Sequence, residues 1–224
     1  MSTKNNGWYK LGIEFVLIIA GILIALAIDN WNKQRETRQL EVQLLQQVRQ
    51  DLVRDSAAVE AVRARRERAA TAIESIVEMM ESDAPPLPQL EYDLSQVFTL
   101  SRIEFRDGAY EIIKSSALAL SDPDLRIAMS DYYEYDAPLF GGDVGDIEHS
   151  FLEIWLPFVN ANISDWEYGE YARPEDPAAL LADERFRRML WAELGNNTSI
   201  LEKAPLLDAQ IRALIDRIDA NLEN

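Results

Sequence analysis

Residues 11–28 read LGIEFVLIIAGILIALAI, an apolar run that only Glu14 interrupts and that the polar segment Asp29-Asn30-Trp31-Asn32 ends. A helix of this length spans roughly 27 Å, close to the thickness of the hydrocarbon core of a bilayer. From Phe15 to Ile28 the run is apolar on all sides, unlike the one-sided stripe of a helix that covers a soluble core. The sequence therefore predicts a transmembrane anchor over residues 11–31.

Two other interpretations of this run are weaker. A cleaved signal peptide has a shorter apolar core and a small-x-small cleavage site, and the run shows neither feature. A helix in the core of the domain is the other alternative, and it fits poorly because fourteen consecutive residues, Phe15 to Ile28, are apolar on all sides. Trp8 and Tyr9 before the run and Trp31 after it are placed like the aromatic belts of a membrane span. We expect a retained anchor behind a short tail of residues 1–10.

Charge is spread unevenly along the chain, whose net charge is −17. Nine basic and six acidic residues lie between Lys33 and Arg68, and eleven basic and thirty-one acidic residues follow from Ala69 onward. Basic residues near a membrane attract anionic lipid, whereas acidic surfaces are repelled by nucleic acid. Membrane lipid is the expected partner and nucleic acid is not. The absence of cysteine excludes disulfides and thiolate chemistry.

The basic residues that flank the run nearly balance, with Lys4 and Lys10 before it and Lys33, Arg35 and Arg38 after it. The positive-inside rule therefore decides little. A ten-residue tail that stays inside while a large domain crosses is the usual outcome for an anchor of this kind, so we expect a periplasmic C-terminal domain.

Residues 32–82 have a helical pattern, without glycine or proline between Lys33 and Glu81. Eleven positions keep a strict heptad spacing, and all but Asp55 and Arg66 are apolar. We predict a long stalk helix over residues 32–82 that continues from the anchor, so that the two form one helix of about 70 residues in all. Its stripe packs either on the helices of the same chain or on a second copy in a coiled coil, where Asp55 and Arg66 would set the register. The heptad positions are Leu45, Val48, Leu52, Asp55, Val59, Val62, Arg66, Ala69, Ile73, Ile76 and Met80.

Residues 83–224 predict an acidic α-helical domain that packs on the stalk. Pro85-Pro86-Leu87-Pro88 ends the long helix, and the Pro138 and Gly141-Gly142 region is expected to break another. We expect a loop over residues 160–177 and no strand. The fold class is all-α, with an N-terminal transmembrane helix, a stalk helix and an antiparallel helical bundle. The predicted helices cover residues 89–100, 107–120, 123–135, 143–158, 177–194 and 198–222, with Pro205 kinking or starting the last one.

Two stretches carry a resemblance to a known family. One is Gly12-Ile13-Glu14-Phe15-Val16-Leu17-Ile18 with Gly21 to Leu26 and Asn30-Trp31-Asn32, and the other is residues 109–116 (AYEIIKSS) with Leu125 and Tyr132-Tyr133. Together they resemble a family of bacterial single-span proteins defined as a domain of unknown function, whose members open with an anchor of the GEIVLVVIGILIAL…NNWN type. Ile13 and Asp29 depart from that pattern. The resemblance implies a bacterial inner-membrane protein with an all-helical domain, and it implies no activity, cofactor or catalytic residue.

Glu14, Ile18, Gly21 and Ala25 share one face of the predicted span, and Gly21 and Ala25 form a small-xxx-small pair that allows another helix to approach closely. A carboxylate in a span is a candidate for pairing or for proton handling. Glu14 lies only one turn inside the run, so its side chain could instead reach the interface. The four residues are the candidate transmembrane packing face, toward copies of the chain or another membrane protein.

The window from Ile127 to Ala172 has no lysine or arginine, ten acidic residues and ten of the twenty aromatic residues of the chain. Such a surface suits a basic partner, a quaternary ammonium group or a divalent cation. The alternative is that the aromatic residues are core and the carboxylates face water. The candidate partner surface consists of Tyr132, Tyr133, Tyr135, Trp155, Trp166 and Tyr168.

Signatures of catalysis and metal binding are weak. Asp146 and His149 have the i, i+3 spacing of carboxylate–histidine ligands, but His149 is the only histidine and no second pair exists. The sequence has no nucleophile elbow, P-loop, H-E-x-x-H motif or dinucleotide fingerprint. We therefore expect no catalytic residue, no cofactor site and no metal site.

These features favour a membrane-anchored interaction or scaffold protein that forms homo-oligomers or joins a larger membrane complex. The first alternative is a subunit of an oligomeric complex that moves ions or protons through Glu14. A remote alternative is a carboxylate-dependent hydrolase of the cell envelope, because glycosidase chemistry needs only two carboxylates.

Overall fold

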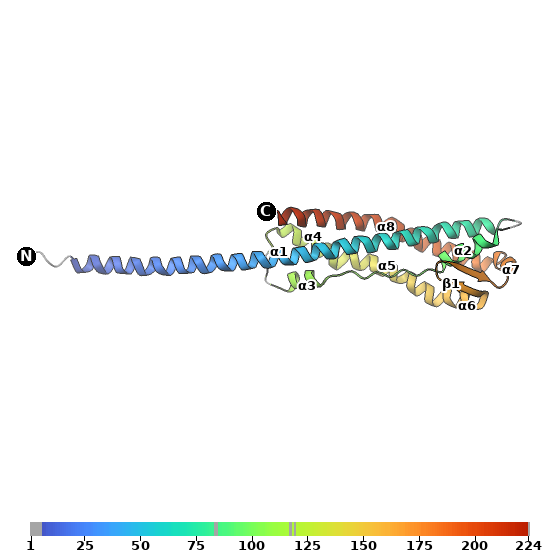
Figure 1. The fold of residues 1–224 in the computed structure, drawn as a ribbon, viewed down its shortest axis with the longest axis horizontal. Coiled ribbons are helices and arrows are strands. Elements are labelled where there is room, and N and C mark those ends of the chain that lie inside the picture. The colour runs from blue at the N-terminus through green and yellow to red at the C-terminus, as the bar shows by residue number, and fades with distance from the viewer. Residues whose placement is uncertain (1–5, 83–84, 117, 119, 224) are drawn as a thin grey trace, which may run out of the picture.

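The computed structural model describes residues 6–82, 85–116, 118 and 120–223, with side chains from Glu14 onward. One helix, α1 (Asn6–Met79), enters the helical domain from an isolated N-terminal segment and runs along the whole domain (Figure 1). Its 74 residues correspond to about 110 Å of helix. The expected long helix is thus confirmed. The expectations for Lys4, Trp8, Tyr9 and Lys10 concern side chains outside the described part.

The rest of the chain forms a helical domain, which confirms the all-α class. Its α-helices are short except for the last, which returns antiparallel to α1. They are α2 (Leu87–Val97), α3 (Gly108–Ser115), α4 (Pro123–Asp131), α5 (Ala137–Ser150), α6 (Leu156–Asn162), α7 (Pro177–Leu181) and α8 (Glu184–Leu222). Two π-helical turns are inserted, η1 (Tyr132–Asp136) and η2 (Phe151–Trp155).

Helix α4 begins as the sequence predicts. The Asp122 carboxylate accepts hydrogen bonds from the N–H groups of Asp124 and Leu125, and Pro123 takes the first helical position. Helix α3 is shorter than the predicted segment 107–120, because it ends at Ser115.

The expectation of a strand-free loop over residues 160–177 is wrong. Strands β1 (Ile163–Glu167) and β2 (Tyr171–Pro174) form an antiparallel hairpin with an irregularity near Ile163. Gly169, with a φ of 77°, supplies the positive φ that the turn between the strands requires. The strands are short and mostly exposed, so they lack the alternation from which strands are predicted.

The expected break at Pro138 and Gly141-Gly142 is also wrong. The helix continues from α4 to α6 because a π-helical turn precedes each proline. The N–H of Ala137 bonds to the carbonyl of Tyr132, and the N–H of Leu156 bonds to that of Phe151. In these wider turns the hydrogen bonds run from residue i+5 to residue i. The helix therefore continues although Pro138 and Pro157 have no N–H group to donate.

The predicted helices 177–194 and 198–222 divide differently from the prediction. Helix α7 is a single short helix, and α8 then runs without interruption for 39 residues. Pro205 lies inside α8 and neither starts nor ends it. Residues 195–197, which the prediction leaves between two helices, are helical, and Asn197 is fully buried.

The heptad stripe of α1 is covered by the helices of the same chain. From Leu45 to Ile76 every heptad position is buried, and only Met80, at the end, is partly exposed. Antiparallel α8 covers much of it, as shown by the contacts of Arg49 with Asp219 and of Ser56 with Asp208, both 2.5 Å. The first of the two interpretations of the stripe is therefore correct. No free heptad stripe is left over residues 45–76 for a coiled coil between copies.

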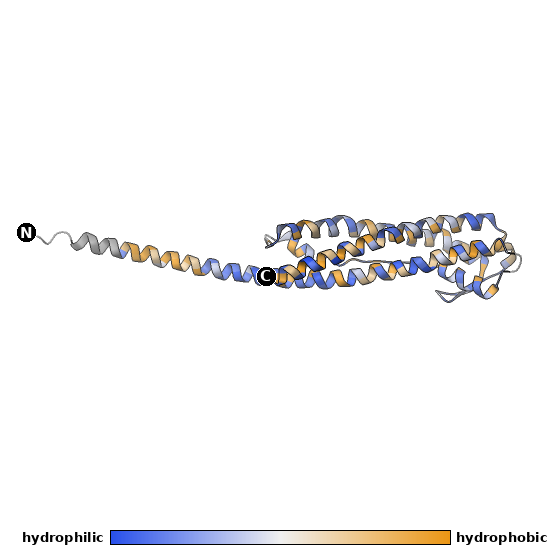
Figure 2. Cartoon of the chain, turned by 90° about the horizontal axis from the view of Figure 1, so that it is seen from above, coloured by the Kyte–Doolittle hydropathy of each residue, from blue (hydrophilic) through white to orange (hydrophobic). Residues whose placement is uncertain are grey.

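The domain holds two hydrophobic clusters along its length. The proximal cluster, nearer the N-terminal segment, includes Leu45, Leu52 and Ile211. The distal cluster includes Ile76, Leu94 and Phe186. The N-terminal segment of α1 is apolar but belongs to neither cluster (Figure 2). Within residues 14–37 only Ala20 is not exposed. The apolar run therefore contributes nothing to the core.

Candidate functional site

The exposed apolar part of α1 is long and apolar enough to cross a membrane. Glu14, Ile18, Gly21 and Ala25 are all exposed on this part, and helical spacing puts them on one face. A Cβ added at Gly21 would meet no atom within 4 Å. A second helix could thus approach this face without displacing any described part of the same chain.

A polar clamp joins α1 to the end of α8 where α1 enters the domain. The Arg38 guanidinium donates to the Ser121 hydroxyl (2.8 Å) and to the Asn221 carbonyl (2.9 Å), and it pairs with Glu41 (2.9 Å). Although burial favours the neutral form of Glu41, hydrogen bonds from Ser121 and Arg38 hold the pKa of this carboxyl below its usual value. The clamp fixes the exposed segment relative to the domain.

The six aromatic residues of the candidate partner surface do not form one surface. Tyr132 and Tyr133 belong to the proximal cluster and Trp155 to the distal one, each less than one-tenth exposed. This part of the prediction is wrong, and the alternative of a core role holds for these three residues. Consecutive Tyr132 and Tyr133 are both buried because they lie in the π-helical turn η1, where the ordinary helical period does not apply.

The other three aromatic residues lie at two places, Tyr135 in η1 and Trp166 and Tyr168 in the β1–β2 hairpin. Tyr135 is exposed, Trp166 packs partly against the distal cluster, and the Tyr168 hydroxyl donates to the Leu100 carbonyl (2.8 Å). The six residues therefore do not form the single exposed surface that the sequence predicts, because three of them are buried.

A buried ion pair separates the two hydrophobic clusters. Arg66 is fully buried, and its Nη2 donates to the carbonyl and the hydroxyl of Thr99, both at 2.8 Å. Its Nη1 lies 3.7 Å from Oε1 of Glu193, whose Oε2 accepts a hydrogen bond from the Trp155 indole. Burial lowers the pKa of Arg66 to about 10 and raises that of Glu193. The sequence marked Arg66 as an unusual heptad residue, but it gave no indication of Glu193.

Asp55, the other polar heptad residue, is buried in the proximal cluster. Its Oδ2 accepts a hydrogen bond from the Tyr132 hydroxyl at 2.9 Å. Burial raises the pKa of this carboxyl to about 6, while the hydrogen bonds from Tyr132 and from the backbone of Arg106 oppose the rise.

Replacing Asp55 with asparagine should remove a pH dependence of stability. Because the folded pKa is higher than the unfolded one, wild-type protein loses stability as pH rises from about 4 to about 7, by about 3 kcal/mol from this group. Asp55→Asn stays neutral and should lack that loss. Urea unfolding across this range measures it. Tyr132→Phe removes a hydrogen bond to the charged form of Asp55 and should move the loss of stability to higher pH. If the free energy of unfolding of Asp55→Asn and of wild type changed equally with pH, the raised pKa of Asp55 would be contradicted.

Three carboxyl groups with raised pKa values are closed off from solvent and from one another. Asp55, Asp93 and Glu193 are at most 4% exposed, and Asp93 accepts hydrogen bonds from Ser75 and Gln89. They do not converge in an open cleft, as a carboxylate-dependent hydrolase would require.

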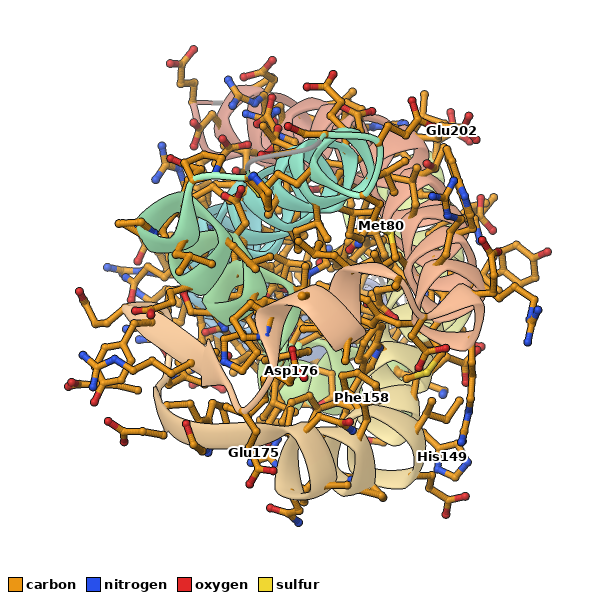
Figure 3. All side chains as sticks on the ribbon, turned by 90° about the vertical axis from the view of Figure 1, so that its right-hand side faces the viewer. Met80, His149, Phe158, Glu175, Asp176 and Glu202 are labelled. Atoms are coloured by element: carbon orange, nitrogen blue, oxygen red, sulfur yellow. The ribbon has the colours of Figure 1, made fainter. Side chains whose placement is uncertain are left out.

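His149 is exposed at the edge of the domain, 3.7 Å from Glu153 (Figure 3). In the described part of the chain, no group of three or more His, Asp or Glu side chains could hold a metal ion.

The end of the domain farthest from the apolar segment holds a cavity of about 580 Å³. Met80 and Asp176 lie at this end (Figure 3), and the other lining residues include Met79, Leu87 and Leu181. Nothing in the sequence pattern predicted this cavity. The adjacent Met79-Met80 pair before the prolines was its only signal.

Comparison with known proteins relates the chain to a protein family. A family model described as a family of unknown function (DUF6090) matches residues 14–146. This range includes the described part of the apolar segment and the helices through most of α5. No curated protein and no solved structure matches the chain.

Proposed function

The chain belongs to this family of unknown function, and from the geometry of α1 we propose that it is a single-pass membrane protein that presents a helical interaction domain at a fixed distance from the bilayer. The observation that carries the proposal is the continuity of α1 from the exposed apolar segment into the buried core. A membrane anchor on a flexible linker would leave the domain free to turn, whereas this anchor is part of the domain's longest helix.

The apolar segment is suited to the anchor role by its exposure. Ten large apolar side chains between Phe15 and Ile28 are at least 40% exposed. Monomeric soluble proteins rarely expose a continuous apolar surface of this kind. We place this segment in a bacterial inner membrane, with the C-terminal domain on the periplasmic side, and the exposed apolar run of α1 supports the membrane placement.

The domain supports an interaction role better than a catalytic one. Its buried carboxyl groups are held by neighbouring side chains, and its distal cavity is lined mostly by apolar residues. From Ile28 to Met79, α1 extends for about 77 Å, so this cavity would stand far from the lipid.

The second part of the proposal is self-association through Glu14, Ile18, Gly21 and Ala25. Small residues that let two helices approach closely favour association in a membrane. Proton transfer through Glu14 has less support, because no other ionisable residue lies between Leu11 and Ile28 to relay a proton.

Replacing Gly21 with leucine should reduce the oligomer to a smaller species. The variant fits the single chain, since nothing lies near the added Cβ, so only contacts between copies should suffer. The full chain in mild detergent can be sized by light scattering and native mass spectrometry. Ala27→Leu adds similar bulk on another face of the same helix and serves as the matched control. An unchanged mass for Gly21→Leu would refute this packing face but leave the anchor untouched.

A further inference from the structure

The layer around Arg66 contains polar atoms that no described group of the protein satisfies. They are Nε and Nη1 of Arg66, Oγ of Ser101, and both side-chain amide atoms of Asn197. All three residues are at most 1% exposed. A buried polar group without a hydrogen-bond partner destabilises the folded state, and five of them in one domain would offset much of its stability. These atoms therefore need partners.

Ser101 and Asn197 are near neighbours, along their own segments, of the two residues that contact Arg66. Asn197 lies one helical turn beyond Glu193 on α8, and Glu193 is the residue that pairs with Arg66. Ser101 follows Thr99 by two residues, and Thr99 accepts both bonds from Arg66 Nη2. The layer thus joins α1, α8 and the segment after α2.

We propose that the Arg66 layer is an internal water-binding site between the two hydrophobic clusters. A buried water makes about three hydrogen bonds to polar groups, so about two waters would satisfy the five atoms. Each water oxygen accepts from the N–H groups of Arg66 or Asn197. The water hydrogens are donated to the Asn197 carbonyl oxygen and the Ser101 hydroxyl.

Water suits this layer better than an anion does. Glu193 already places a carboxylate 3.7 Å from Arg66, so an anion would meet a negative charge as well as a positive one. The Arg66 and Asn197 side chains are fully buried among packed helices, which suits a small, neutral guest. Water also offers both donors and acceptors, as the mixed set of atoms requires.

The experiment is an NMR measurement of magnetisation transfer from water to side chains, made on the full chain in lipid nanodiscs. Arg66 Nε–H and the Asn197 amide should show cross peaks with long-lived water in the wild-type protein. Asn197→Leu removes two of the five atoms and should abolish the Arg66 Nε–H cross peak. Asn160→Leu, at an exposed asparagine on α6, should retain it.

Two results would overturn the proposal. One is the absence of water cross peaks at Arg66 Nε–H in the folded wild-type protein, and this measurement decides the matter even if Asn197→Leu fails to fold. The other is a saturable shift of the Arg66 signals on titration with chloride or inorganic phosphate, which would show an anion site.

Discussion

Replacing Arg66 with leucine should lower the free energy of unfolding by about 3–5 kcal/mol, because the change leaves Glu193 buried without its counter-charge. The Arg66→Leu/Glu193→Gln double variant should recover most of this loss. Glutamine is neutral and still accepts the hydrogen bond that the Trp155 indole donates to Glu193. Chemical unfolding followed by circular dichroism measures the three free energies.

Arg63→Leu is the matched control for this prediction. Arg63 lies one turn earlier on α1 and makes ion pairs with Glu60 and Glu67 at the surface, where such pairs contribute little. Its unfolding should resemble that of wild type. A double variant no more stable than Arg66→Leu would show that the guanidinium is needed for packing and not for charge balance.

Removing residues 1–31 should convert the protein from a membrane-bound to a freely soluble one. Ten Leu, Ile, Val and Phe side chains between Phe15 and Ile28 would each favour insertion by about 0.3–0.6 kcal/mol, or about 3–6 kcal/mol together. The full chain should stay with vesicles in carbonate, and the chain that begins at Asn32 should remain in the supernatant. Centrifugation and blotting measure the partition.

The shortened chain should keep its thermal unfolding transition, because residues 14–31 bury no side chain in the domain and the Arg38 clamp is retained. This transition is the control for misfolding. Extraction of the full chain by carbonate would refute the membrane anchor, as would a folded short chain that still sediments with vesicles.

The sequence predicted the parts of the fold that depend on uniform patterns. The apolar run and the heptad stripe from Leu45 to Ile76 extend over many turns, so their periods identify one long helix and its buried face. Asp122-Pro123 is a local signal that needs no tertiary partner, and it marked the start of α4 correctly.

The failures occur where tertiary contacts or unusual helical turns override local signals. Pro138 ends an ordinary helix, but here it follows a π-helical turn whose hydrogen bonds avoid the missing N–H. The same turn buries both Tyr132 and Tyr133, so these two residues of the predicted partner surface lie in the core. The predicted gap between residues 194 and 198 lies inside α8, where Asn197 is fully buried.

The clamp and the unbroken helix make α1 a lever arm. Transmembrane helices tilt by about 20° on average, and bilayer thickness changes that angle. Over about 77 Å of helix, a tilt of about 20° displaces the distal end sideways by about 26 Å. A change in membrane thickness that changes the tilt of α1 would therefore move the distal end of the domain sideways. Lipid composition would then affect which neighbouring molecules this end can contact.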